Sequence, residues 1–348
     1  TAMALSQMDA EGRGESLVDP TSSSLTFYEK GAWALILLRE QVGDQKFSKG
    51  VKAFLEAHPY GNVTVQDFLS KMEQVSGQSL SDFRRNWLEA KTFPREAALD
   101  YLLSRSPSIK QYIGLQKLAS GQQADFGTIR KAWKAHAESA YREHLIRDYR
   151  ELFNRPFLDT LFLEGSLPVS KTLLVTTQTI EPWMVPLVEA WLDAPSYDLR
   201  EAALFRLWVV NPPERRKYLD RISENGSLAD IGLKQLWWLL SLLTEAGVEP
   251  ETKKAYLQGL RETTGAAYSW EIRQNAFSML HEVGALDGQN ILDLIQSTEH
   301  HSWQYRKFAR NLFETLLQDN GGREILWEIA RTLPREDYPY VYEKLEQS

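Results

Sequence analysis

The chain has 348 residues, of which 43% are hydrophobic, and a formal net charge of −7 from 40 basic and 47 acidic residues. This composition is enough for buried cores, and it argues against a disordered chain or a basic surface for nucleic acid. Cysteine is absent, which excludes disulfides and thiolate chemistry. The longest apolar runs, residues 33–38 and 236–240, fall well short of the roughly 20 residues of a membrane span. We therefore expect no nucleic-acid partner and no membrane span, in a soluble protein of the cytoplasm or periplasm.

Nearly all of the chain after residue 25 has the pattern of helices. Apolar side chains recur at helical spacing over residues 47–55, 68–75 and 81–90. Thr64 precedes the second of these segments and Asp67 follows three residues later, which predicts an N-cap with a capping box. The first part of the chain is therefore predicted to be a set of short amphipathic helices.

Pro94 marks a predicted boundary, because a proline disfavours helical geometry in the residue before it. After it, helices of ordinary length alternate with short proline and glycine breaks. The β-branched stretch 173–179 is the nearest approach to a strand, and it is isolated. We expect an all-α protein with two domains, residues 1–94 and 95–348.

One pattern recurs three times in the second domain: serine, an aromatic residue, an apolar residue and arginine, followed by alanine and a large apolar residue at four-residue steps. The copies start at Ser196, Ser269 and Ser302. Their separations of 73 and 33 residues fit a repeat of helix pairs. These stretches resemble the second helices of HEAT or armadillo units, with serine as the N-cap and alanine allowing close helix packing. The pattern predicts an α-helical repeat domain.

Histidine spacing gives no local metal site. Among the six histidines, His281-Glu282 begins the H-E-x-x-H pattern of zinc peptidases, but position 285 is alanine. The segment that stands out is the start of the helix at residue 27. Tyr28, Gly31, Ala32 and Leu35 share one face of that helix. From spacing alone, Tyr28 is either a ligand-facing phenol or a buried ring beside a glycine that admits a crossing helix.

The segment Tyr-Glu-Lys-Gly-Ala at residues 28–32 resembles the Y-x-K-G-A segment of the M1 family of zinc aminopeptidases, the gluzincin group. Further elements follow in the order found in that family, over roughly residues 19–94. They are Leu37-Leu38, Val42-Gly43-Asp44, Phe47-Ser48-Lys49-Gly50, Phe54-Leu55, His58-Pro59-Tyr60-Gly61-Asn62, Thr64, Asp67-Phe68, Ser76-Gly77, Leu80, Phe83 and Trp87.

The resemblance implies that residues 1–94 are the C-terminal helical lobe of a thermolysin-like peptidase domain and that 95–348 are the C-terminal repeat domain. It implies peptide substrates and one catalytic residue, Tyr28, whose hydroxyl would stabilise the oxyanion of the tetrahedral intermediate. Glu29 and Lys30 are expected on the helix surface or in packing. No substrate-binding residue can be assigned from the motif.

The family's H-E-x-x-H motif, its distal glutamate and its G-x-M-E-N loop do not occur in these 348 residues. We therefore expect a C-terminal fragment of an aminopeptidase that lacks metal ligands, contains no cofactor and is inactive alone. The zinc would belong to the intact parent, whose N-terminal part would be a partner of this fragment. The alternative is a non-catalytic helical-repeat scaffold that binds a protein, with Tyr28 packed in its core.

Overall fold

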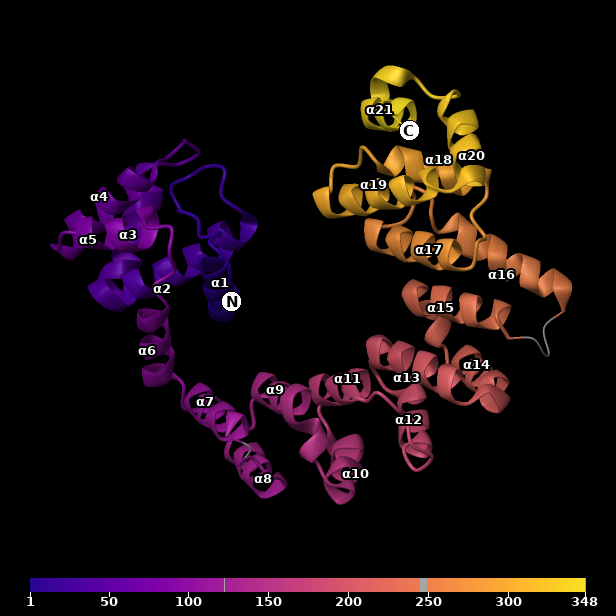
Figure 1. Cartoon of the computed structure of the whole chain (residues 1–348), viewed down its shortest axis with the longest axis horizontal. Helices are drawn as coiled ribbons and strands as arrows, with labels where there is room; N and C mark the ends of the chain where they lie inside the picture. Colours follow the sequence, from indigo (N-terminus) through magenta and orange to yellow (C-terminus); the bar gives the residue numbers. More distant parts are fainter. Residues whose placement is uncertain (122, 245–248, 348) are drawn as a thin grey trace. The chain divides into compact units, whose positions relative to one another are not determined.

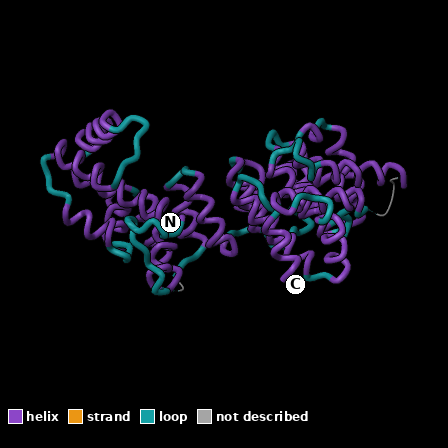
Figure 2. Tube along the Cα trace, turned by 90° about the horizontal axis from the view of Figure 1, so that it is seen from above, coloured by secondary structure: helices purple, strands orange, loops and turns teal. Residues whose placement is uncertain are grey.

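The computed structural model describes residues 1–121, 123–244 and 249–347. Within these residues all regular structure is helical and no strand occurs, as Figure 1 and Figure 2 show. The predicted all-α class is confirmed, and the stretch 173–179 lies mostly within a helix. No helix in this described part is both long and apolar enough to cross a membrane.

Contacts divide the chain into two compact units, Thr1–His136 and Ala137–Ser348, which we call unit 1 and unit 2. The predicted domain boundary at residues 94 and 95 stays a prediction. Helix α6 (Arg95–Arg105), which begins directly after Pro94, contacts α1 (Ala2–Ala10) and α2 (Gly31–Val42) of unit 1.

Within its described residues, 1–121 and 123–136, unit 1 contains eight α-helices and two short π-helical segments. They are α1 (Ala2–Ala10), η1 (Leu25–Lys30), α2 (Gly31–Val42), α3 (Asp44–Ala57), α4 (Val65–Ser76), α5 (Ser81–Phe83), η2 (Arg84–Glu89), α6 (Arg95–Arg105), α7 (Pro107–Ser120) and α8 (Phe126–Ala135).

Unit 2 contains thirteen α-helices and five 3₁₀ turns within its described residues. They are α9 (Ser139–Tyr149), η3 (Arg150–Leu152), α10 (Arg155–Glu164), α11 (Leu167–Thr176), α12 (Val185–Ala190), η4 (Trp191–Asp193), α13 (Tyr197–Val210), η5 (Pro212–Glu214), α14 (Arg215–Glu224), η6 (Ser227–Ala229), α15 (Ile231–Leu242), α16 (Pro250–Glu262), α17 (Trp270–Glu282), α18 (Gly288–Ser297), α19 (Trp303–Leu317), α20 (Asn320–Ala330), η7 (Arg335–Asp337) and α21 (Pro339–Gln347).

The hairpin of α3 and α4 shows how the sequence sets local structure in unit 1. Thr64 is the N-cap of α4, and its hydroxyl accepts a hydrogen bond from the Asp67 amide while the Asp67 carboxylate accepts one from the Thr64 amide. The predicted capping box is confirmed. On the facing side of α3, a Cβ atom at Gly50 would collide with the Met72 sulfur, so any larger residue at position 50 would force the Met72 side chain to move.

Unit 2 is built from successive helix pairs. Each second helix of a pair contacts the second helix of the next pair along the series α11, α13, α15, α17 and α19. The repeated alanines and large apolar residues lie on three helices of this series, α13, α17 and α19, and all six are fully buried. They are Ala203, Leu207, Ala276, Leu280, Ala309 and Phe313.

The three repeated serines stand at the N-cap positions of α13, α17 and α19, as predicted, but their side chains cap nothing. Ser196, Ser269 and Ser302 accept no hydrogen bond from the first turn of their helices. The arginines of the same motif instead reach back to the loop before the helix. Arg273 donates through Nε to the Thr264 carbonyl at 2.7 Å.

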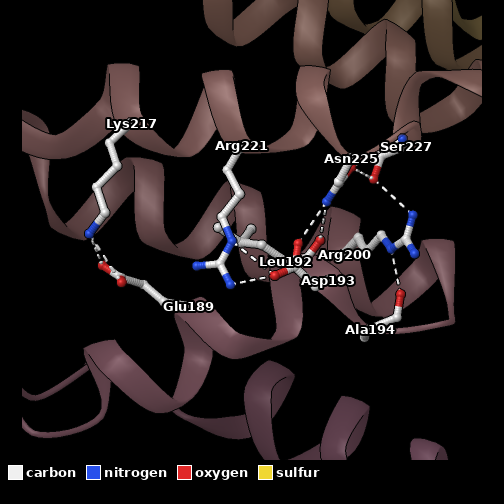
Figure 3. A network of polar contacts seen from close by, with 9 residues as sticks. All are labelled: Glu189, Leu192, Asp193, Ala194, Arg200, Lys217, Arg221, Asn225 and Ser227. Atoms are coloured by element: carbon white, nitrogen blue, oxygen red, sulfur yellow. Dashed lines mark hydrogen bonds and ion pairs between the residues drawn. The ribbon is translucent and has the colours of Figure 1, made fainter.

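A polar network connects the neighbouring pairs α12–α13 and α14–α15 (Figure 3). Arg200 donates to the Ala194 carbonyl and, at 2.8 Å, to the Ser227 hydroxyl. Arg221 forms an ion pair with Asp193, which lowers the pKa of that carboxyl, chiefly through the hydrogen bond from the guanidinium. These ion pairs and hydrogen bonds join residues that are about one helix pair apart in the sequence. They thus hold successive helix pairs in register.

Candidate functional site

Tyr28 lies in the π-helical turn η1, directly before α2. Its side chain is 76% exposed, whereas Thr26 and Lys30, two residues to either side, are fully buried. The buried side chains of residues 26 and 30 therefore anchor the turn, and Tyr28 points outward on the opposite side. Turns of this π type are uncommon and occur frequently at functional sites.

A groove of about 530 Å³ opens beside Tyr28 on the surface of unit 1. Its lining is mostly apolar and includes all four residues that were predicted to share the face of Tyr28. The lining residues are Leu17, Phe27, Tyr28, Gly31, Ala32, Ala34, Leu35, Leu38, Phe54, Val63, Thr64, Val65, Phe68, Leu69, Phe83 and Leu88.

The alternative of a buried Tyr28 ring beside a crossing helix is wrong. The ring is exposed, and a Cβ atom at Gly31 would meet only the Leu17 side chain, at an ordinary contact distance of 3.7 Å. Open space therefore remains next to the phenol. A hydroxyl at the edge of an apolar groove can donate a hydrogen bond to a ligand that enters the groove.

The far wall of the groove comes from the α3–α4 hairpin. Phe54 of α3 and Phe68 of α4 pack edge to face, with ring centroids 5.3 Å apart. Val63, Thr64 and Val65 continue this wall at the start of α4. The groove thus runs between two rigid elements, the η1–α2 helix on one side and the hairpin on the other.

Lys30 was expected on the helix surface or in packing, and the structure buries it with only 1% exposure. Its ammonium donates hydrogen bonds to three main-chain carbonyls: to Glu15 at 2.7 Å, to Ala90 at 2.7 Å and to Lys91 at 3.1 Å. Burial lowers the pKa of this ammonium, while the carboxylates of Asp9 and Glu15 act in the opposite direction. Lys30 is therefore an internal cation that joins η1 to two other segments of unit 1.

Glu15 holds the other end of the same turn. Its carboxylate accepts hydrogen bonds from the amide and hydroxyl of Ser23, at 2.7 and 2.6 Å, and from the Thr26 hydroxyl at 2.6 Å. The hydrogen bonds from Ser23 and then Thr26 lower the pKa of this carboxyl. Sequence reasoning missed Glu15, and it gave Lys30 no role beyond the helix surface or packing. The only available signal was a charged residue four positions after Thr26, a spacing that places both on one side of a helix.

A metal site cannot be built from the described residues. Within 1–121, 123–244 and 249–347, no three or more histidine, aspartate or glutamate side chains are placed to hold one ion. His281 stands in the last turn of α17 without the second histidine of a zinc motif. The rings of His300 and His301 lie 4.1 Å apart, and the Nδ1 of His300 accepts the Ser302 amide, so this pair serves as a local contact at the start of α19.

Comparison with known proteins finds a match in the segment that contains Tyr28 and the groove. Residues 19–87 match the family described as "Peptidase family M1 domain". Aminopeptidase N of Lactococcus lactis subsp. lactis is 37% identical over 71 residues, which are 20% of this chain and 8% of that protein. Aminopeptidase N of Streptomyces lividans is 40% identical over 62 residues, 18% of this chain and 7% of its own length.

Aminopeptidase N of Escherichia coli strain K12 is 34% identical over 89 residues, which are 26% of this chain and 10% of that protein. The chain thus matches about a tenth or less of the length of these relatives. No solved structure matches the chain. The resemblance predicted from the Tyr28 motif is confirmed for the segment that carries it: through residues 19–87, this chain is related to the M1 family of aminopeptidases.

Proposed function

We propose that this chain is the C-terminal part of an M1 aminopeptidase, which removes N-terminal residues from peptides. The observation that carries the proposal is the position of Tyr28. It is an exposed phenol at the edge of an apolar groove, inside the segment that matches the peptidase family. Residues 1–94 would be the helical lobe of the peptidase domain, and Tyr28 its catalytic residue.

In this proposal the Tyr28 hydroxyl donates a hydrogen bond to the oxygen that becomes negative when the scissile carbonyl is attacked. A donor fixed in position before the reaction stabilises developing charge without reorganising, and one such donor contributes a factor of about 10² to 10³ in rate. The position of Tyr28 supports this role, because its turn is anchored on both sides by the buried residues Thr26 and Lys30. The open space beside Gly31 leaves room for a substrate to approach the hydroxyl.

The family relationship also implies zinc, and the described residues do not fit it, because they offer no group of suitably placed ligands. We therefore derive no step through the metal. In the proposed function the ligands come from the upstream part of the parent protein, where the H-E-x-x-H motif and its distal glutamate would stand. The proposal accordingly expects the 348-residue chain alone to be inactive.

For residues 95–348 we propose a HEAT- or armadillo-like repeat domain. The contacts between successive helices of the series α11, α13, α15, α17 and α19 support this, as do the fully buried alanines and large apolar residues that recur on α13, α17 and α19. Two features depart from a simple repeat. The motif serines do not cap their helices, and the motif arginines bond to loop carbonyls instead.

The test is the exchange of Tyr28 for phenylalanine in the zinc-bearing protein. We expect kcat for an aminoacyl-nitroanilide to fall by about 10² to 10³ with KM nearly unchanged, because the lost bond acts mainly on the transition state. The matched control is Tyr60→Phe, since Tyr60 is also fully exposed in unit 1 but does not line the groove.

Equal rates in the Tyr28 and Tyr60 variants would remove Tyr28 from the reaction. A parent gene without H-E-x-x-H upstream would favour the second candidate, a non-catalytic scaffold. The chain alone gives a further check: chelator-sensitive turnover by the 348 residues would contradict their expected inactivity.

A further inference from the structure

We propose that Lys30 is a positioning residue that fixes the π-turn carrying Tyr28. This inference rests on the proposed function, because it assigns Lys30 a role toward the hydroxyl that would meet the substrate. The inference begins from the way in which the Lys30 ammonium is buried. A lysine ammonium is almost never fully buried without a partner, yet the three atoms that receive its hydrogen bonds are main-chain carbonyls.

The three carbonyls belong to two segments that are far apart in the sequence. The Glu15 carbonyl lies in the loop after α1, and the carbonyls of Ala90 and Lys91 follow directly after η2. The same two segments are joined independently, since the Leu17 amide and the Ser16 hydroxyl both donate to the Leu88 carbonyl, at 2.9 and 3.0 Å. Lys30 therefore ties η1 to a junction that is already held together.

Charge-assisted hydrogen bonds are shorter and stronger than neutral ones, so the three bonds give the end of η1 a fixed position. At the start of η1, Thr26 is held by the Glu15 carboxylate. One residue, Glu15, thus contacts both ends of the turn, through its carboxylate at Thr26 and through its carbonyl at Lys30. Tyr28 stands midway between these two anchors, so the main chain that carries its side chain is held on both sides.

This arrangement matters for catalysis because the value of a hydrogen-bond donor depends on its placement. A displacement of about 1 Å at a reacting centre can cost about 10²-fold in rate. If Lys30 sets the position of the Tyr28 hydroxyl, removing its ammonium must affect kcat even where the protein stays folded. A lysine that only stabilises unit 1 would have no such effect below the unfolding transition.

The first experiment uses the 348-residue chain and needs no activity. Lys30→Met keeps the length of the side chain and removes the three bonds. Thr26→Val is a smaller change that removes the hydrogen bond from the Thr26 hydroxyl to Glu15 at the other end of the turn. It is the test variant if the Lys30 variant fails to fold. The control is Lys46→Met, because Lys46 also donates to a main-chain carbonyl in unit 1, that of Ser76 at 2.9 Å, but lies outside η1.

The readouts are amide hydrogen exchange in residues 25–31 and the ring signal of Tyr28 in a tyrosine-labelled NMR sample, assigned by its loss in Tyr28→Phe. We expect Lys30→Met and Thr26→Val to raise the exchange rates of residues 25–31 about tenfold or more relative to those of α4, and to shift the ring signal. Lys46→Met should leave both unchanged. An unaltered ring signal and unaltered exchange in both test variants would overturn the inference, whatever Tyr28 does in catalysis.

The second experiment measures kinetics in the zinc-bearing protein that the proposed function requires. We expect Lys30→Met to lower kcat by about 10- to 100-fold with KM nearly unchanged, and Lys46→Met to leave both constants at their original values. A full rate in Lys30→Met would overturn the positioning role. The proposed function fails by a different result, a full rate in Tyr28→Phe, so the two failures can be told apart.

Discussion

Units 1 and 2 use their buried polar groups in different ways. In unit 1 an internal cation, Lys30, joins one short turn to the main chain of two distant segments, next to an open apolar groove. In unit 2 polar side chains recur from layer to layer. Arg200 reaches Ser227 and Arg273 reaches Ser297, each about one helix pair further along the chain.

This difference shows what each arrangement is suited to do. A repeated set of contacts distributes stability along a series of helices, so that each layer supports the next. A concentrated set of contacts fixes one point of the surface, which is what a site for chemistry requires. The family match falls only on the unit with the concentrated set, at residues 19–87.

The largest expected effect tests whether the two units are energetically separate. Phe277 is fully buried in α17, and Phe277→Ala should lower the free energy of unfolding of unit 2 by about 3–5 kcal/mol through lost contacts and a residual cavity. Urea unfolding followed by hydrogen exchange would assign the loss to a unit. We expect the amides of α4 in unit 1 to keep their protection.

The matched control for that change is Phe205→Ala, since Phe205 is 47% exposed in the same unit and should cost about 0.5 kcal/mol or less. Equal loss of protection in α4 and α17 after Phe277→Ala would break the comparison, because it would show that the units unfold as one.

A smaller effect distinguishes the helix starts of the two units. Thr64→Ala removes the capping box of α4 and should cost about 1 kcal/mol. Ser302→Ala removes a side chain that holds the same position in α19 but caps nothing, so its cost should be smaller. Thermal unfolding of both variants measures the difference. A greater loss from Ser302→Ala would contradict the assignment of the two caps.

The smallest effect concerns a carboxyl in unit 2. Burial, and then the nearby carboxylates of Asp198 and Asp230, raise the pKa of Glu201. A carboxyl whose pKa is higher in the folded state stabilises the fold at low pH, and this contribution is lost as the pH rises through the raised value. Glu201→Gln should therefore stabilise unit 2 at pH 7 by a few tenths of a kcal/mol, about what a partly exposed carboxyl can contribute.

The gain in stability from Glu201→Gln should disappear as the pH falls below the ordinary pKa of a glutamate, because the wild-type carboxyl is then neutral as well. Urea unfolding at pH 4 and pH 7 measures this, with the exposed residue Glu224 changed to glutamine as the control. The same gain at both pH values would show that charge at residue 201 is not its cause.

The sequence predicted the helices of unit 1 well where a local signal set their ends. Thr64 with Asp67 begins α4, and the apolar residues Phe83, Trp87 and Leu88 are buried as the helical pattern of 81–90 predicted. The outward position of Tyr28 followed from the family resemblance, because spacing alone also allowed a buried ring. These features depend on neighbours within one or two turns, which a single sequence reveals.

The features that could not be predicted depend on contacts between distant segments. Lys30 was expected on the helix surface or in packing, but its carbonyl partners lie at the junction of residues 15–17 with 88–91, which no local pattern indicates. No local pattern indicated the π geometry of η1 either. The capping role predicted for the motif serines was also wrong. Each serine stands at the predicted N-cap position, but its hydroxyl accepts no hydrogen bond from the first turn of its helix.

The glycine at position 50 has a consequence for any molecule that enters the groove. The helices α3 and α4 touch through Gly50 and Met72, and the paired rings of Phe54 and Phe68 belong to the same hairpin. The helix spacing at Gly50 therefore helps to set the shape of the wall that an incoming molecule meets. A bulkier residue at position 50 would reshape the wall from behind, at a distance from every group that a ligand could touch.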